Sequence, residues 1–232
     1  MALAGAMSET ARIALDAARV LYARRPVRPP GRRSPFLQPT GDVMDDTFAA
    51  RLNMVESQVR TADVTDLRIQ DAMRRIPREV FLPAARAYQA YADVEPEYAP
   101  GRRLLRPRDV AKLVQLAAPV AGEQGLAIAA PYAASLLEAC GVSVTRFDDE
   151  ALARPPAGPF DILVCEGAMG QIPAEWLEAL SVGGRAVVIE RQGPAGRAVV
   201  YLRTAEGFGR RTGFDATPAF LPGLEPQIGF AF

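Results

Sequence analysis

The stretch Gly125–Asp149 reads GLAIAAPYAASLLEACGVSVTRFDD and decides the fold. Its first six residues are apolar enough for a buried strand. Residues 132–140 have the composition of a helix that Gly141 ends, and residues 142–147 read as a second strand. Enzymes often hold nucleotide-like cofactors in such a strand-helix-strand frame. The turn between the first strand and the helix, however, contains no glycine.

The segments after this stretch continue the alternation of strands and helices. Residues 160–168 are predicted to form a third strand, 173–184 a helix that a double glycine ends, and 185–191 a fourth strand. A closing hairpin over 197–203 and 207–214 follows. We therefore predict an α/β fold with a Rossmann-like, mostly parallel sheet over residues 120–232. The apolar C-terminal tail, with Phe214, Phe220, Leu221, Phe230 and Phe232, is expected to pack back over the sheet.

Helical patterns fill residues 44–119, ahead of the sheet. Apolar residues recur at helical spacing from Phe48 to Val59, and residues 107–117 begin with a proline at a position where helices start. Between them, residues 65–76 form a helix with Thr65 or Asp66 as its N-cap. Its predicted buried face consists of Leu67, Ile69, Ala72, Met73 and Ile76. This part is predicted to be a helical region packed on the core.

Residues 1–43 have a different composition, because arginine and proline dominate their second half. We expect a largely disordered tail without a packing pattern. Two interpretations stay open for it. One is a basic arm or an organelle-type transit segment. The other is an over-extended gene start, since Met44 opens MDDTFAARLNMVESQVR like a natural beginning.

Composition limits the function classes. The 232 residues carry 27 basic and 27 acidic side chains, a formal net charge of zero that disfavours nucleic acid and anionic membranes as partners. No apolar run approaches the roughly 20 residues that span a bilayer. Histidine is absent and the two cysteines form no CxxC pair, so histidine bases, metal sites and a disulfide framework are not expected. We predict a cytoplasmic, monomeric protein with reduced thiols.

Several segments together resemble the protein-L-isoaspartate O-methyltransferase family. They are MVESQV (54–59), TDLRIQDAM (65–73), IPREVFLP (76–83), AYAD (90–93) and PFDILVCEGAMGQIPAEWLEALSVGGRAVV (159–188). The resemblance covers roughly residues 48–190, with a poor middle. It implies a class I methyltransferase fold and the use of S-adenosylmethionine to esterify the α-carboxylate of L-isoaspartyl residues in damaged proteins, a repair reaction.

The resemblance also implies where the cofactor would lie, and there the sequence departs from the family. Ala129 and Ala130 stand in the turn where the family has several glycines, which allow close backbone approach and positive φ. Pro131 has no amide hydrogen and restricts Ala130. Glu166 and Gly167 come just after the FDILV segment (160–164) of the third strand, where the family's sulfonium would be approached, although a carboxylate at a strand end is common.

Asp148, at the end of the second strand, stands where related enzymes hold the ribose hydroxyls. A helix N-cap or a solvated turn is the alternative for it and for Asp149. Only ten residues, 150–159, replace a helix and a strand of the family. The sheet is therefore predicted to be smaller by about one strand.

The acceptor segment has changed as well. Arg103 and Leu105 stand at positions where the family has a threonine and a serine beside the reacting carboxylate. Together with Arg102 and Arg106, Arg103 is a candidate ligand of a carboxylate or another anion, because guanidinium groups suit planar anions. A solvated basic turn is the alternative. No catalytic constellation is recognised in the sequence.

Two hypotheses follow from these observations. In the first, the chain is a non-catalytic descendant that binds no cofactor and uses the scaffold to bind an unknown protein partner. In the second, it is an active S-adenosylmethionine-dependent carboxyl methyltransferase that acts on isoaspartyl proteins or peptides. The glycine-free loop, the shortened middle and the lost acceptor hydroxyls favour the first, because methyl transfer depends on aligning donor and acceptor.

Overall fold

The computed structural model describes residues 42–149 and 151–226. The predicted tail over 1–43 lies outside these residues, except that Asp42 and Val43 belong to the first described helix. Phe230 and Phe232 of the predicted apolar C-terminal tail lie outside them as well.

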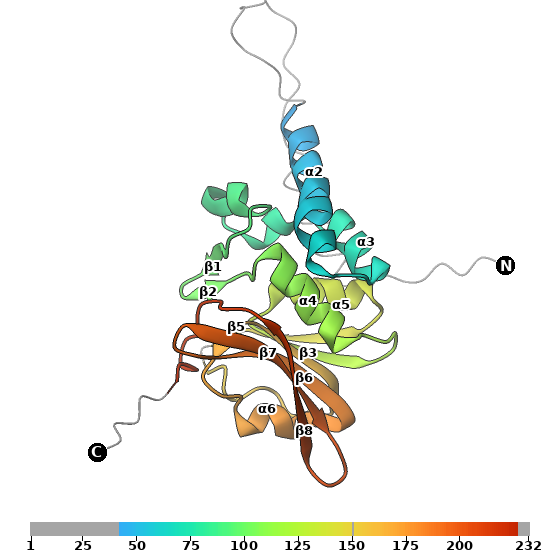
Figure 1. The fold of residues 1–232 in the computed structure, drawn as a ribbon, viewed down its shortest axis with the longest axis vertical. Coiled ribbons are helices and arrows are strands. Elements are labelled where there is room, and N and C mark those ends of the chain that lie inside the picture. The colour runs from blue at the N-terminus through green and yellow to red at the C-terminus, as the bar shows by residue number, and fades with distance from the viewer. Residues whose placement is uncertain (1–41, 150, 227–232) are drawn as a thin grey trace, which may run out of the picture. The chain divides into compact units, whose positions relative to one another are not determined.

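Helical elements make up most of the described chain before the sheet (Figure 1). An N-terminal proline begins α4, as predicted, and the carboxylate of Asp66 caps α3 by accepting a hydrogen bond from the N–H of Arg68. In chain order the helices are α2 (Asp42–Met54), the π-helical turn η1 (Val55–Val59), the 3₁₀ turn η2 (Arg60–Ala62), α3 (Leu67–Arg75), the 3₁₀ turns η3 (Arg78–Phe81) and η4 (Ala84–Gln89), α4 (Pro107–Ala117), α5 (Pro131–Ala139) and α6 (Ala174–Glu178).

A six-stranded sheet follows, with the order β4-β3-β5-β6-β7-β8. Its strands are β3 (Gln124–Ile128), β4 (Ser143–Phe147), β5 (Phe160–Met169), β6 (Leu180–Gln192), β7 (Ala195–Arg203) and β8 (Phe208–Asp215); two short strands, β1 (Glu97–Ala99) and β2 (Arg102–Arg103), pair separately. The β4-β3-β5-β6 half is parallel and the β6-β7-β8 half is antiparallel. The predicted α/β class, with a mostly parallel sheet and a closing hairpin, is confirmed.

The parallel half of the sheet ends at β4, which among the described residues pairs with β3 alone. Between β4 and β5, the described residues 151–159 form neither a helix nor a strand. Instead, Leu152 is buried below the sheet and its carbonyl oxygen accepts a hydrogen bond of 2.8 Å from the indole N–H of Trp176. This short connection limits the sheet to six strands.

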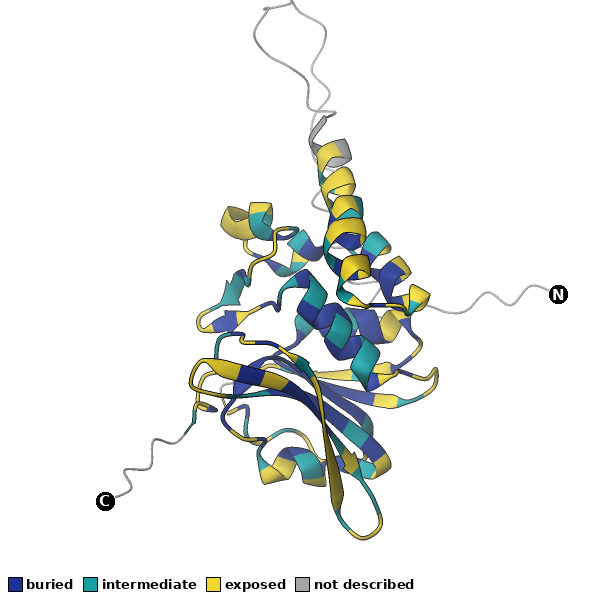
Figure 2. Cartoon of the chain, in the orientation of Figure 1, coloured by how far each residue is buried: buried dark blue, intermediate teal, exposed yellow. Residues whose placement is uncertain are grey.

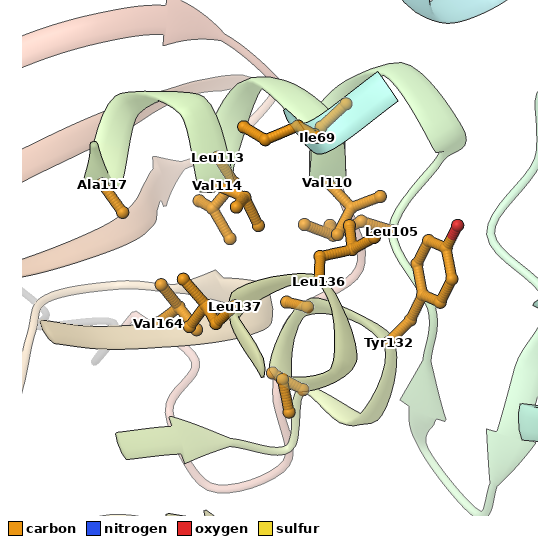
Figure 3. Close-up of a cluster of buried hydrophobic side chains, with 14 of the residues drawn as sticks. Ile69, Leu105, Val110, Leu113, Val114, Ala117, Tyr132, Leu136, Leu137 and Val164 are labelled. Atoms are coloured by element: carbon orange, nitrogen blue, oxygen red, sulfur yellow. The ribbon is translucent and has the colours of Figure 1, made fainter. Parts of the chain in front are cut away.

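Buried side chains form one cluster on each face of the sheet. Along β5, Ile162 and Val164 point to the first cluster, whereas Leu163 and Cys165 point to the second. The first cluster contains the inner faces of α3, α4 and α5 (Figure 3). The second lies under α6, around Trp176. Figure 2 shows the central strands buried, whereas β8 is almost entirely exposed.

Two sequence predictions about the elements are wrong in part. The helix predicted over 173–184 ends at Glu178, and Leu180–Gly184 already belong to β6. The reason is tertiary, because Leu180 pairs with Phe160 and Arg185 pairs with Ile162 of β5. Leu67, predicted on the buried face of α3, is 67% exposed because it is the first residue of the helix, next to its N-cap.

Within residues 42–149 and 151–226, no helix combines the length and apolar character needed to cross a membrane. No group of three or more histidine, cysteine, aspartate or glutamate side chains in this part of the chain is placed to hold a metal ion. Cys140 and Cys165 are both buried, free thiols.

Candidate functional site

Most of the predicted cofactor residues meet at one edge of the sheet, where β3, β4 and β5 end. We call this the carboxyl edge and define it by residues 129–133, 147–149 and 165–168. Parallel strands present their carboxyl ends together, and ligands of open α/β sheets bind there. The fold therefore brings together Ala129, Asp148 and Glu166, which are far apart in sequence.

The turn after β3 keeps a backbone shape that glycine favours, although no glycine is present. Ala129 has a φ of 46°, and its N–H donates a hydrogen bond of 2.8 Å to the carbonyl oxygen of Phe147. Ala130 is the N-cap of α5 and Pro131 its first residue. Both alanine side chains are buried, Ala129 at 0% and Ala130 at 3% exposure. Methyl groups thus occupy space next to the backbone of this turn.

Glu166 occupies the centre of the carboxyl edge. The pairing of β5 with β6 is irregular between Val164 and Ala168, and such a bulge turns side chains away from the regular pleat. Glu166 is 1% exposed and points to the N-terminus of α5. Its Oε1 accepts hydrogen bonds from the N–H groups of Tyr132 at 3.0 Å and Ala133 at 2.8 Å, and its Oε2 accepts one from Leu105 at 3.0 Å. A carboxylate of the chain itself therefore caps α5.

Arg78 supplies a positive charge to this buried group. It is fully buried, and its guanidinium lies over the ring of Tyr132, 4.9 Å from the centroid. Its Nη2 donates to the carbonyl oxygen of Leu105. Leu105 thus links the two charges, since its carbonyl accepts from Arg78 and its N–H donates to Glu166. Nε and Nη1 of Arg78 and the hydroxyl of Tyr132 find no hydrogen-bond partner among the described residues.

Burial shifts the pKa of both charged groups. It raises the pKa of the Glu166 carboxyl, while Arg78 and the three N–H donors act in the opposite direction. It also lowers the pKa of the Arg78 guanidinium, against the attraction of Glu166. Both carboxyl oxygens accept N–H hydrogen bonds, an arrangement that suits the ionised carboxylate rather than the acid.

Asp148 lies at the end of β4 but is engaged by neighbouring side chains. Its carboxylate accepts a hydrogen bond of 2.9 Å from the hydroxyl of Tyr98 and pairs with Arg102 at 3.0 Å. Arg102 also donates to the carbonyl oxygen of Asp149 at 2.7 Å. Burial, together with the charge of Asp148, raises the pKa of Tyr98 far above its usual range. The role of Asp148 as a ribose ligand stays a prediction.

Arg103 and Arg106, which were predicted to bind the acceptor carboxylate, lie close to Glu95. Nε of Arg106 is 3.6 Å from the carboxylate of Glu95, and Nη1 of Arg103 is 3.5 Å from the Glu95 carbonyl oxygen. Binding of an acceptor carboxylate by these arginines stays a prediction, since Glu95 already balances part of their charge.

The C-terminal segment, residues 216–226, packs against the end of β5, the part of the carboxyl edge around Gly167 and Ala168. Ala168 donates to the carbonyl oxygen of Ala219 and accepts from the N–H of Leu221, both at 2.8 Å. Leu221 lies so close to Gly167 that an added Cβ would be 2.6 Å from its Cγ. Between this segment, residues 101–105 and the end of β5 lies a cavity of about 10 Å³, room for a single water molecule.

Sequence reasoning missed several residues of this region. Arg78 and Glu95 were not singled out, because single charged residues carry no sign of burial. Glu166 was named as a candidate, but its bonding to α5 could not be anticipated. The apolar C-terminal tail was expected to pack back over the sheet, and its residue Leu221, at 1% exposure, belongs to the second buried cluster.

Comparisons with known proteins agree with this architecture. No family model matches the chain. A protein-L-isoaspartate O-methyltransferase of Methylorubrum extorquens is 29% identical over 229 residues, covering 87% of this chain and 98% of that protein. Another, from Methylorubrum populi, is 30% identical over 212 residues, covering 80% of this chain and 99% of that protein.

Solved structures match the fold at lower identity. A chain from Plasmodium falciparum, named as a protein-L-isoaspartate O-methyltransferase and crystallised with S-adenosyl-L-homocysteine, has a TM-score of 0.59 at 11% identity, over 74% of this chain and 97% of that chain. A second structure of that name has a TM-score of 0.58 at 17% identity, over 75% of this chain and 67% of that chain. Because sequence similarity runs through nearly the whole length of the Methylorubrum relatives, the chain belongs to the protein-L-isoaspartate O-methyltransferase family.

Proposed function

We propose that this chain is a non-catalytic member of its family that serves as a binding scaffold for another protein. The observation that carries the proposal is that the carboxyl edge is filled by the chain's own groups. A carboxylate caps α5, alanine methyl groups line the turn after β3, and the segment 216–226 packs against the end of β5.

Available space supports this proposal. Sites for ligands of drug or cofactor size have volumes of about 300–1,000 Å³. The cavity between Glu166 and residues 218–221 has about 10 Å³. This small space beside the end of β5 supports the proposal that S-adenosylmethionine is not bound there, and we derive no methyl-transfer step for this chain.

Hydrogen bonding supports it as well. A cofactor that approaches the start of α5 needs N–H groups of the first helical turn. Those of Tyr132 and Ala133 are engaged by Glu166, and Pro131 has none. On the acceptor side, the carboxylate of Glu95 lies near Arg106, where an isoaspartyl carboxylate would have to compete.

The direct test is isothermal titration calorimetry of S-adenosylmethionine and S-adenosylhomocysteine into the full chain. We expect no binding heat with ligand up to about 1 mM. We also expect an unchanged melting temperature, whereas a ligand at 100 times its Kd would stabilise a protein by about 2.7 kcal/mol. The Methylorubrum populi relative, titrated under the same conditions, is the control that the ligand is intact and that its binding can be detected.

The alternative function is an active carboxyl methyltransferase that acts on L-isoaspartyl residues. It would be supported by micromolar binding that the substitution Asp148→Ala weakens, together with methyl transfer to an isoaspartyl peptide. That result would overturn the non-catalytic proposal. Arg197→Ala is the matched control for this variant, because it removes an exposed charge that pairs with Asp215, away from the carboxyl edge.

A further inference from the structure

A set of hydrogen-bond donors converges on one point at the start of α5. Two of them, the N–H groups of Tyr132 and Ala133, belong to the first turn of a nine-residue helix, where unpaired N–H groups and the helix dipole favour an anion. The third is the N–H of Leu105, which precedes α4 in a separate segment of the chain. The three donors come from parts of the chain that are brought together only by folding.

A buried cation with two unpaired nitrogen atoms points to the same ligand chemistry. Arg78 is 0% exposed and contacts Leu105 and Tyr132, two of the residues whose N–H groups converge. Its Nε and Nη1 have no hydrogen-bond partner among the described residues. A guanidinium without water or a counter-ion is costly, so this position requires a negative charge close by.

We propose that these groups form a carboxylate-binding site and that Glu166 is its internal ligand, so that the site is complete but filled. The donors match a carboxylate: two N–H groups donate to one oxygen and the third donates to the other, and all three distances lie between 2.8 and 3.0 Å. A phosphate is larger than the carboxylate group that this buried space holds, so a carboxylate is the ligand class that fits. This inference goes beyond the proposed loss of catalysis, because it does not depend on whether the chain binds a cofactor.

The test is to remove the internal ligand and supply an external one. Glu166→Ala leaves the three N–H donors and Arg78 in place and vacates a space the size of a small monocarboxylate. We expect a melting temperature lower by roughly 6–20 °C, because a buried cation loses its counter-ion. Sodium formate should restore about 3–6 °C at roughly 100 mM for a Kd near ~10 mM. Acetate should act similarly and butyrate less.

Controls separate this effect from general salt effects. Sodium chloride at equal ionic strength should not reproduce the saturable shift. The unsubstituted chain should not respond to formate, because Glu166 fills its site. Glu190→Ala, which removes another carboxylate engaged by an arginine and a tyrosine, should not respond either.

If Glu166→Ala does not fold alone, the fraction that refolds from urea in formate and in chloride gives the same information. A crystal structure of the variant with formate on the N–H groups of Tyr132 and Ala133 would support the site. The absence of any saturable formate effect on both the melting temperature and the refolded fraction would overturn it. The outcome is independent of the calorimetry with S-adenosylmethionine, so the two proposals fail separately.

Discussion

At the scale of single residues, Arg78 and Glu166 show how a buried charge is stabilised in this protein. Both side chains are buried, and no direct ion pair joins them among the described residues. They are joined through Leu105 and through the first turn of α5. Removing one partner of such a buried pair leaves the other uncompensated, which costs more than the pair contributes as a whole.

We predict that Arg78→Met lowers the free energy of unfolding by about 3–5 kcal/mol, since Glu166 keeps a buried charge without its cation. The double variant Arg78→Met with Glu166→Gln should lose less than the sum of the single losses, by about 1–3 kcal/mol. Urea unfolding of the four proteins measures both quantities. Arg197→Met, at an exposed pair with Asp215, should change little. Additive losses would contradict an interaction between the two charges.

Ala129 gives a second test at the residue scale, because its φ of 46° strains any residue with a Cβ. Ala129→Gly relieves about 1–2 kcal/mol of strain. It loses about as much through the greater freedom of the unfolded chain and the lost methyl group. We therefore predict an almost unchanged free energy of unfolding.

Ala127→Gly is the matched control, because Ala127 is also buried, at 2% exposure, but lies within β3 and is not among the residues with positive φ. It should lose about 1–2 kcal/mol more than Ala129→Gly, measured by urea unfolding. Equal losses at both positions would show that the turn carries no strain.

Individual site residues were the hardest feature to predict from sequence. The pattern of strands indicated which residues lie at the carboxyl edge, because it shows where along the chain each strand ends. It did not indicate which partners their side chains contact. Which side chain bonds to which depends on the bulge in β5 and on the loop around Leu105, and neither has a local sequence signal. For the same reason Arg78 was missed, whereas Glu166 was named without its partners.

At the scale of elements, the start of α3 shows how a cap couples stability to pH. The Arg68 guanidinium and N–H hold the pKa of the Asp66 carboxyl below its usual value. A carboxyl group whose pKa is lowered on folding stabilises the protein above its unfolded pKa of about 3.9. This contribution is lost as the pH falls through the lower pKa of the folded state.

We predict that Asp66→Ala lowers the free energy of unfolding by about 1 kcal/mol at pH 7 through loss of the N-cap. The difference from the unsubstituted chain should stay constant from pH 7 to pH 5 and narrow below about pH 4. Asp66→Asn keeps a capping oxygen without charge, so its smaller deficit should vanish at the acid end. Urea unfolding at several pH values checks both curves. A deficit of Asp66→Asn that grows in acid would contradict a lowered pKa of Asp66 in the folded protein.

Elements were predicted better than sites because periodicity reports burial. β3 to β5 alternate between the two clusters, and helix starts were marked by Asp66 and by the proline of α4. The failure at residues 173–184 arose because leucine and glutamate favour a helix locally. There, pairing of Leu180 and Arg185 with β5 determines the outcome.

At the scale of the whole molecule, the sheet connects two cores that share no side chains. β5 contributes alternate residues to each, so neither core can be lost while the strand stays in place. Domains built around one shared sheet usually unfold in a single cooperative step. The chain also carries its own probe of one core, since Trp176 is its only tryptophan, is fully buried in the second cluster and bonds to Leu152.

Leu136 belongs to the first cluster (Figure 3). We predict that Leu136→Ala lowers the urea midpoint of unfolding of the second cluster by the same amount as that of the first. Leu136 is 0% exposed, so the substitution should cost about 2–5 kcal/mol. Tryptophan fluorescence follows Trp176 on the other face of the sheet, and far-UV circular dichroism follows the helices. Both should give one coincident urea transition in each protein, moved to lower urea by the same amount. If the fluorescence transition stayed in place while the dichroism transition moved, the two faces would unfold independently, and the sheet would not transmit stability between them.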